Sequence, residues 1–136
     1  MALSKVGGGQ QLSDGNVNEI KLSTQPTPTA ITGDATLTAA ILATRLITFN
    51  KGSDADIAAT LSTGALMDAY FTNMHVDDAF DFATVNLNDS GTSSTVTMTA
   101  GTGFSIVGLV TVGRLSSVKW RARKTATSTW VCYRLG

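Results

Sequence analysis

Few residue patterns in the sequence could perform chemistry, and the first is a glycine-rich stretch, Gly101-Thr-Gly103. A loop of this kind can hold a phosphate group when its glycines lead into a helix. Here the spacing to the next glycine, Gly108, is not that of a G-x-G-x-x-G motif, and no Gly-Lys-Ser/Thr occurs anywhere. Val96 and Met98 alternate with threonines before the glycines, and a second alternation begins at Phe104. The pattern therefore predicts a β-hairpin whose turn contains the two glycines.

The second pattern surrounds the only histidine, His75, which is followed by Asp77, Asp78 and Asp81. A divalent cation such as Ca²⁺ requires several oxygen ligands, and the spacing of an EF-hand is absent. Any Ser-His-Asp triad would have to use His75, and no G-x-S-x-G stretch is present to place the serine. We interpret the segment as an Asp-rich connection between a helix and a strand. We expect no catalytic residues, no metal site and no cofactor.

Cys132 is the only cysteine. It has no partner within the chain for a disulfide, and a zinc site would lack a second cysteine ligand. We therefore expect Cys132 to be a small buried apolar residue.

The strongest surface signal is a row of cations, Lys119, Arg121 and Arg123. They alternate with Val118, Trp120 and Ala122, which places the two sets on opposite faces of a strand. Three interpretations are open for the row. It can be a solvated row that protects a sheet edge, it can contact another protein, or it can follow a nucleic-acid backbone while tryptophans stack on bases. Because Trp120 points away from the cations, a core tryptophan is favoured over a stacking one.

Charge and composition limit the classes of function. The net charge is zero, which argues against a freely diffusing nucleic-acid-binding protein. Charged residues make up 15 % of the chain, against roughly 25 % in ordinary soluble domains. The 21 threonines and 12 serines supply an uncharged polar surface in their place. A surface with so few charges suits a protein that works in an assembly.

The charges are also segregated along the chain. Between Gly52 and Gly113 there are seven aspartates and no Lys or Arg, and from Arg114 onward there are six cations and no acid. Folding can bring the two blocks together within one chain. Alternatively, acidic and basic faces can meet across a subunit contact.

The order of patterns along the chain predicts an arm and a body. Residues 1–33 contain a triple glycine, a Pro-x-Pro and little periodic apolar content, so we expect an extended N-terminal arm there. Val17, Ile20 and Leu22 form its one short strand-like stretch. Residues 34–136 form the body, for which we expect strands at 45–49, 57–61, 79–87, 96–98, 104–106, 107–112, 116–124 and 129–135.

Helical turns are predicted within 36–43, capped by Thr36 or Thr38, and a further helix is predicted to begin at Thr63-Gly64. Met67, Tyr70, Phe71 and Met74 have the spacing of its buried face. Seven or eight strands with frequent turns and one or two short helices predict an all-β body, a β-sandwich or jelly roll. No apolar run is long enough to span a membrane and no signal peptide begins the chain, so we expect synthesis in a cytoplasm and no membrane partner.

Seven stretches of the body occur in an order that allows a comparison with a known family: 37–43 (LTAAILA), 61–69 (LSTGALMDA), 78–82 (DAFDF), 85–87 (VNL), 97–104 (TMTAGTGF), 121–125 (RARKT) and 130–134 (WVCYR). In these stretches the chain resembles the head-decoration, or capsid cement, proteins of tailed bacteriophages. The resemblance covers roughly residues 35–135 and leaves the arm outside.

The resemblance implies a β-rich structural protein of the virion, without enzymatic residues, that is made in the host cytoplasm and sits on the capsid surface. Its implied partners are the major capsid protein and further copies of itself, most simply in a homotrimer. On this reading Val17, Ile20 and Leu22 of the arm, with Lys119, Arg121 and Arg123, are the expected capsid or subunit contacts. The alternative function is a receptor- or glycan-binding module of a phage tail or head fibre.

Overall fold

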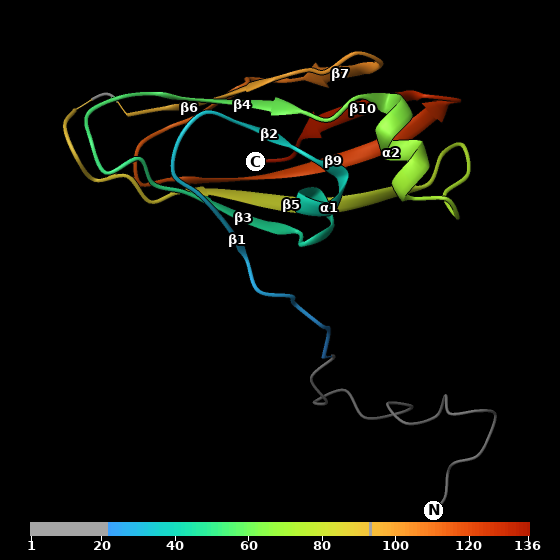
Figure 1. Cartoon of the computed structure of the whole chain (residues 1–136), viewed down its shortest axis with the longest axis horizontal. Helices are drawn as coiled ribbons and strands as arrows, with labels where there is room; N and C mark the ends of the chain where they lie inside the picture. Colours follow the sequence, from blue (N-terminus) through green and yellow to red (C-terminus); the bar gives the residue numbers. More distant parts are fainter. Residues whose placement is uncertain (1–21, 93) are drawn as a thin grey trace, which may run out of the picture.

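The described part of the chain, residues 22–92 and 94–136 of a computed structural model, folds into two β-sheets packed face to face (Figure 1). A six-stranded sheet has the strand order β1 (Thr29–Ile31), β3 (Leu46–Phe49), β5 (Ala79–Asn86), β9 (Ser117–Ala126), β10 (Thr129–Arg134), β7 (Phe104–Val107). A four-stranded sheet has the order β2 (Ala35–Leu37), β4 (Ile57–Leu61), β6 (Val96–Thr99), β8 (Thr111–Val112). The predicted mainly-β, sandwich-like body is therefore confirmed.

From β1 to β8 the chain alternates between the two sheets, one strand at a time. As a result β1, β3 and β5 lie side by side and parallel in one sheet, and β2, β4 and β6 do so in the other. Antiparallel pairing joins β5 to β9, β9 to β10 and β6 to β8. A jelly roll is built from antiparallel strands, so the jelly-roll detail of the prediction is not confirmed. From β1 to β6 the chain instead winds as a flattened coil, with one strand of each turn in each sheet.

The predicted hairpin at residues 96–106 is wrong. β6 pairs with β4 and β8, whereas β7 lies in the other sheet and pairs with β10. The glycine-rich turn between them therefore crosses from one sheet to the other. Its backbone carbonyls are occupied by protein donors, because the Gly64 N–H donates to Thr102 O at 2.8 Å and the Trp130 N–H donates to Gly103 O at 2.8 Å.

Gly64 begins a helix at this crossing and has no space for a side chain. A Cβ at this position would lie well inside van der Waals contact of the Ser128 carbonyl. Replacing Gly64 with alanine is therefore expected to lower the free energy of unfolding by about 1–3 kcal/mol, the usual range for overpacking. Denaturant titration measures the effect, with Gly33→Ala as the matched control because nothing lies within 4 Å of a Cβ there. Equal stability of the two variants would contradict this account.

Both predicted helices are present and threonines cap them, but residues 36–37 of the first predicted range belong to strand β2. Helix α1 (Ala39–Ala43) follows Thr38, whose Oγ1 accepts from the Ile41 N–H at 3.3 Å, and α2 (Gly64–Tyr70) follows Thr63, whose Oγ1 accepts from the Leu66 N–H at 3.2 Å. Within the described residues, neither helix has the length and apolar character that crossing a membrane requires.

The predicted buried face of the second helix is partly wrong. Met67 is buried, but α2 ends at Tyr70, and the Tyr70 side chain is 52 % exposed. Phe71 and Met74 lie in the loop that follows and still pack against the core. The helix therefore ends earlier than the apolar spacing suggested, and Tyr70, its last residue, is not part of the buried face.

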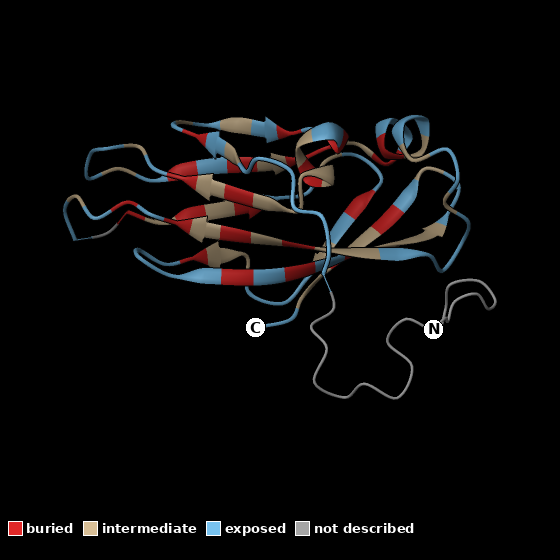
Figure 2. Ribbon diagram, turned by 90° about the horizontal axis from the view of Figure 1, so that it is seen from below, coloured by how far each residue is buried: buried red, intermediate tan, exposed pale blue. Residues whose placement is uncertain are grey.

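The core lies between the sheets and follows the predicted alternation of β9 (Figure 2). Val118, Trp120 and Ala122 are buried, while Lys119 and Arg121 face outward. The Trp120 indole Nε1–H donates to Thr84 Oγ1 at 2.9 Å, so the buried polar atom of the ring has a partner. Trp120 is therefore a core residue, as its alternation predicted.

Cys132 is buried, as predicted, and burial raises the pKa of its thiol to about 12. A thiol with such a pKa carries almost no thiolate at neutral pH and is therefore a poor nucleophile.

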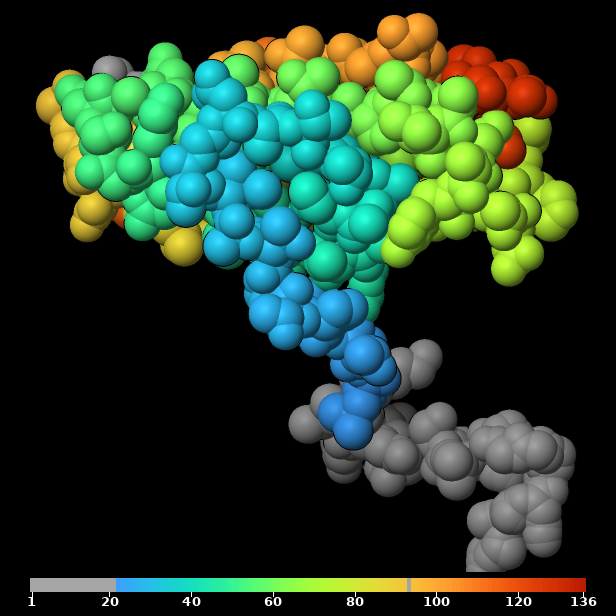
Figure 3. Space-filling view, in the orientation of Figure 1, coloured from blue at the N-terminus to red at the C-terminus, as the bar shows by residue number. Residues whose placement is uncertain are grey.

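The end of the predicted arm range belongs to the six-stranded sheet. Thr29–Ile31 forms the edge strand β1, which pairs in parallel with β3, and Ile31 is buried against the core. Residues 22–28 are exposed and project from the body (Figure 3). Leu22 is 90 % exposed, while Val17 and Ile20 lie outside the described residues.

Candidate binding surface

A hollow of about 370 Å³ lies where α1, the loop after α2 and the start of β5 meet. We call it the Arg45 pocket, and it is lined by Ala43, Arg45, Phe71, Met74, Asp78, Ala79 and Phe80. Most of this lining is apolar, and Arg45 and Asp78 add one cation and one anion. Apolar hollows with a few polar groups at defined positions are the usual form of binding sites.

The apolar wall of the pocket is the outer layer of an aromatic cluster. The ring centroids of Phe71 and Phe80 are 5.0 Å apart, and the Phe71 ring is 6.3 Å from that of Trp130. Trp130 is buried, and its ring stacks at 6.1 Å on Phe104, its partner on the neighbouring strand β7 of the same sheet. The wall therefore continues directly into the core, which holds the shape of the pocket.

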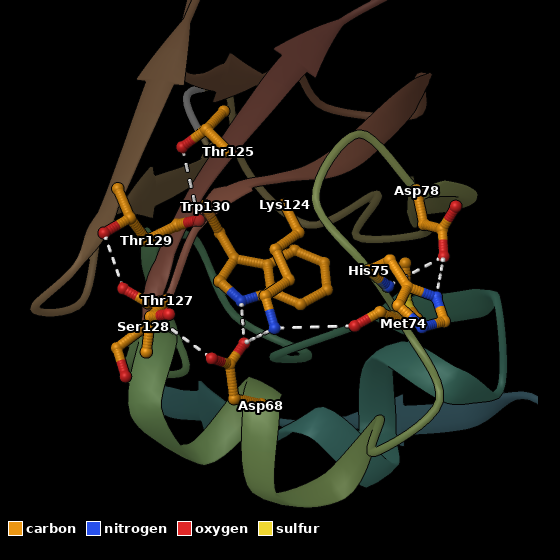
Figure 4. Close-up of polar contacts among 10 residues, drawn as sticks. All are labelled: Asp68, Met74, His75, Asp78, Lys124, Thr125, Thr127, Ser128, Thr129 and Trp130. Atoms are coloured by element: carbon orange, nitrogen blue, oxygen red, sulfur yellow. Dashed lines mark hydrogen bonds and ion pairs between the residues drawn. The ribbon is translucent and has the colours of Figure 1, made fainter.

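Asp68 of α2 fixes this cluster from below (Figure 4). Its Oδ1 accepts from the Trp130 indole Nε1–H at 2.9 Å and lies 3.1 Å from Lys124 Nζ, and its Oδ2 accepts from the Ser128 N–H at 2.7 Å. Lys124 Nζ also donates to the Met74 carbonyl at 3.5 Å. One carboxylate thus joins α2, the β9–β10 hairpin and the loop that forms the pocket wall.

Arg45 connects the pocket to the N-terminal segment. It has a positive φ of 65°, which turns the chain sharply between α1 and β3. Its Nη2 donates to the Thr24 carbonyl, and the Gln25 side-chain amide donates to Thr44 O at 2.7 Å. The segment that leads to the arm therefore leaves the body at the edge of the Arg45 pocket. Arg45 and Gln25 also line a smaller neighbouring hollow of about 190 Å³.

Asp78, the anion of the pocket lining, is held by the turn before β5. Its Oδ2 accepts from the His75 N–H at 2.8 Å and lies 3.6 Å from His75 Nδ1 (Figure 4). The neighbouring acids point elsewhere, because Asp77 pairs with Arg123 and Asp81 pairs with Arg121. In the described part of the chain no three His, Cys, Asp or Glu side chains gather as metal ligands.

The cation row of β9 lies on the outer face of the six-stranded sheet, where it meets the acidic block. Arg121 Nε donates to Asp81 Oδ1 at 2.6 Å, Lys119 Nζ lies 3.4 Å from Asp81 Oδ2, and Arg123 pairs with Asp77. The interpretation that folding brings the segregated charges together within one chain is therefore confirmed for these residues. The row is an ion-paired surface, and exposed pairs of this kind each contribute little to stability.

Three carboxylates should make the fold sensitive to acid. The pKa values of Asp56, Asp68 and Asp81 all lie below the ordinary 3.8. Hydrogen bonds from Thr95 lower the pKa of Asp56. Hydrogen bonds from Arg121, together with its charge, lower the pKa of Asp81. Burial raises the pKa of Asp68, but the hydrogen bonds from Ser128, Trp130 and Lys124 outweigh it.

A carboxyl whose pKa is lower in the folded state stabilises the fold above its unfolded pKa, and that contribution is lost as pH falls through the folded value. We therefore expect a stable melting midpoint from pH 7 to about 5 and a fall below pH 4, measured by circular dichroism across the series. Asp68→Asn should flatten that fall. An unchanged midpoint of the parent protein at pH 3 would contradict the expectation.

The sequence pointed to the cation row but missed the Arg45 pocket. Phe71 and Met74 are apolar positions of the predicted helix, and Asp78 belongs to the predicted acidic connection. Nothing in their spacing shows that the turn at Arg45 brings α1 beside them. A comparison of the chain with family models, with curated proteins and with solved structures finds no match.

Proposed function

We propose that this chain is a structural protein of a bacteriophage virion, a decoration or cement subunit that binds the outside of the capsid through the major capsid protein and stabilises the shell. The observation that supports it most is that the chain combines a folded body with an exposed N-terminal segment. A compact two-sheet body carries an exposed segment, residues 22–28, that leaves it beside an edge strand. A subunit that tethers itself to a repeated surface needs both parts.

The chemistry of the outer surface fits the same role. On the body, Asp77 and Asp81 pair with the cations of β9. The large apolar side chains Val107, Leu109 and Leu115 are exposed around β7 and β8. Exposed apolar residues beside a neutralised face favour contact with other proteins over binding of a nucleic acid.

Removal of residues 1–21 tests the proposal. We expect the shortened protein to keep its melting midpoint within about 1 °C, because every strand of the described body remains. Its co-sedimentation with undecorated capsid shells should fall at least tenfold, because the arm no longer reaches a neighbour. Removal of residues 1–31 is the control for a truncation that cuts too far, since it deletes β1 and should also lower the midpoint. Full binding by the first truncation would contradict the proposal.

A second candidate is a receptor- or glycan-binding module, and the aromatic wall of the Arg45 pocket favours it. Sugar rings stack on aromatic faces while charged side chains hold their hydroxyls. A glycan array probed with the full chain tests this candidate, and Phe80→Ala should abolish any signal that arises from the pocket.

A further inference from the structure

We infer that the Arg45 pocket is the docking site for residues 17–22 of a neighbouring copy of this chain, so that copies are joined by exchange of their arms. The inference deepens the proposed function by naming the contact between subunits. It can be tested on the purified protein without any capsid, so its failure is separable from that of capsid binding.

The path of the chain brings an arm to the pocket. Arg45 and Thr44 hold the segment at Thr24 and Gln25, so each pocket has the start of an arm at its edge. From there Leu22 points into solvent and the segment runs away from its own body (Figure 3). Six extended residues, 17–22, span about 20 Å, enough to cross a subunit boundary. The direction of the segment favours the pocket of a second copy over its own.

The residue types of the segment complement the pocket. In an extended strand Ile20 and Leu22 share one face, and Glu19 and Lys21 share the other. The apolar face matches the wall formed by Phe71, Met74 and Phe80.

The charges can be paired as well. Glu19 and Lys21 carry opposite charges two residues apart, and the pocket lining includes one cation, Arg45, and one anion, Asp78. Glu19 and Lys21 leave the strand on the face away from the apolar wall, and both are long enough to bend back to the rim, with Glu19 beside Arg45 and Lys21 beside Asp78. Like charges would meet in the reverse orientation, so the pairing also fixes the direction in which the arm lies.

Two copies can exchange arms reciprocally, which closes a dimer, or each arm can enter the pocket of the next copy. Contacts of the second kind are heterologous and close into a ring when the rotation between copies permits it. A ring of three would give the homotrimer that the resemblance implies.

The test uses cysteine cross-linking, which the chain permits because its own Cys132 is buried with a raised thiol pKa. Ile20→Cys protein is mixed with Ala79→Cys protein, whose new thiol lies at the exposed edge of the pocket. The matched control is Ile20→Cys mixed with Leu115→Cys, which is exposed at the opposite end of β5 and β9. Under mild oxidation the first mixture should form a heterodimeric disulfide at least tenfold faster than the second. Equal rates would overturn the inference.

A chain that carries both Ile20→Cys and Ala79→Cys distinguishes exchange from docking within one copy. Linked oligomers on a denaturing gel support exchange, and a circularised monomer overturns it. Glu19→Arg should slow cross-linking at least fivefold, and Arg45→Glu in the pocket partner should restore it, provided that both proteins keep their melting midpoints. A failure of rescue in folded proteins, or a glycan that occupies the pocket and leaves cross-linking unchanged, would also count against the inference.

Discussion

Replacing Trp120 with alanine is expected to lower the free energy of unfolding by about 3–5 kcal/mol, the usual cost of emptying a large aromatic site in a core. The Trp120 side chain is 0 % exposed. Its indole N–H donates to Thr84 Oγ1, and the Arg134 guanidinium lies 5.8 Å from the ring centroid. The substitution therefore removes packing, a buried hydrogen bond and a cation–π contact together.

Two further variants separate these contributions. Trp120→Phe keeps most of the packing and loses the hydrogen bond, so it should cost about 1–2 kcal/mol. Thr84→Val removes only the acceptor and leaves the indole N–H unpaired, which should cost a similar amount. Guanidinium titration followed by circular dichroism gives all three values. If Trp120→Ala left the midpoint unchanged, Trp120 would have to lie on the surface.

Replacing Asp68 with alanine is expected to cost about 2–4 kcal/mol, since it removes the acceptor of the Trp130 indole and the partner of a largely buried ammonium. The Lys124 side chain is only 14 % exposed, and Asp68 Oδ1 lies 3.1 Å from its Nζ. The loss should extend to the pocket, because the same carboxylate fixes α2 against the hairpin that carries Trp130.

Two control variants separate the loss of a negative charge from the loss of the hydrogen bonds that Asp68 accepts. Asp68→Asn keeps one acceptor oxygen and should cost less than Asp68→Ala, while Asp89→Ala changes an exposed aspartate and should leave stability within about 0.5 kcal/mol. Denaturant titration gives the stabilities, and the emission maximum of Trp130 in a Trp120→Phe background reports on the ring itself. A stability loss at Asp89 equal to that at Asp68 would show that charge alone, and not this network, is responsible.

The sequence predicted best those features that depend on near neighbours. The strand Ile57–Leu61, the caps Thr38 and Thr63 and the two faces of the strand around Trp120 are all set by residues within a few positions. Alternation and capping are local, so they can be read without knowledge of what lies opposite.

Pairing between strands was the part that could not be predicted. A glycine-rich turn serves equally in a hairpin and in a crossing between sheets, and only the partners of β6 and β7, which come from distant parts of the chain, decide between them. The Arg45 pocket was missed for the same reason. Its lining comes from two separate regions of the sequence, 43–45 and 71–80, and they meet because Arg45 adopts a backbone conformation that its residue type does not signal.

The alternation of strands between sheets has a consequence for the kinetics of folding. Pairings such as β1 with β3, β4 with β6 and β5 with β9 each close a long loop of chain before any hydrogen bond forms, whereas β9 and β10 are joined by a short turn. Loop closure of this kind slows folding to milliseconds or seconds. We expect the β9–β10 hairpin and β5 to form the folding nucleus. The earlier strands, which alternate between the sheets, then add to it in turn from β4 back to β1. On that order β1 is laid down last, so the segment at residues 22–28 is anchored beside Arg45 only when the body that offers the pocket is already complete.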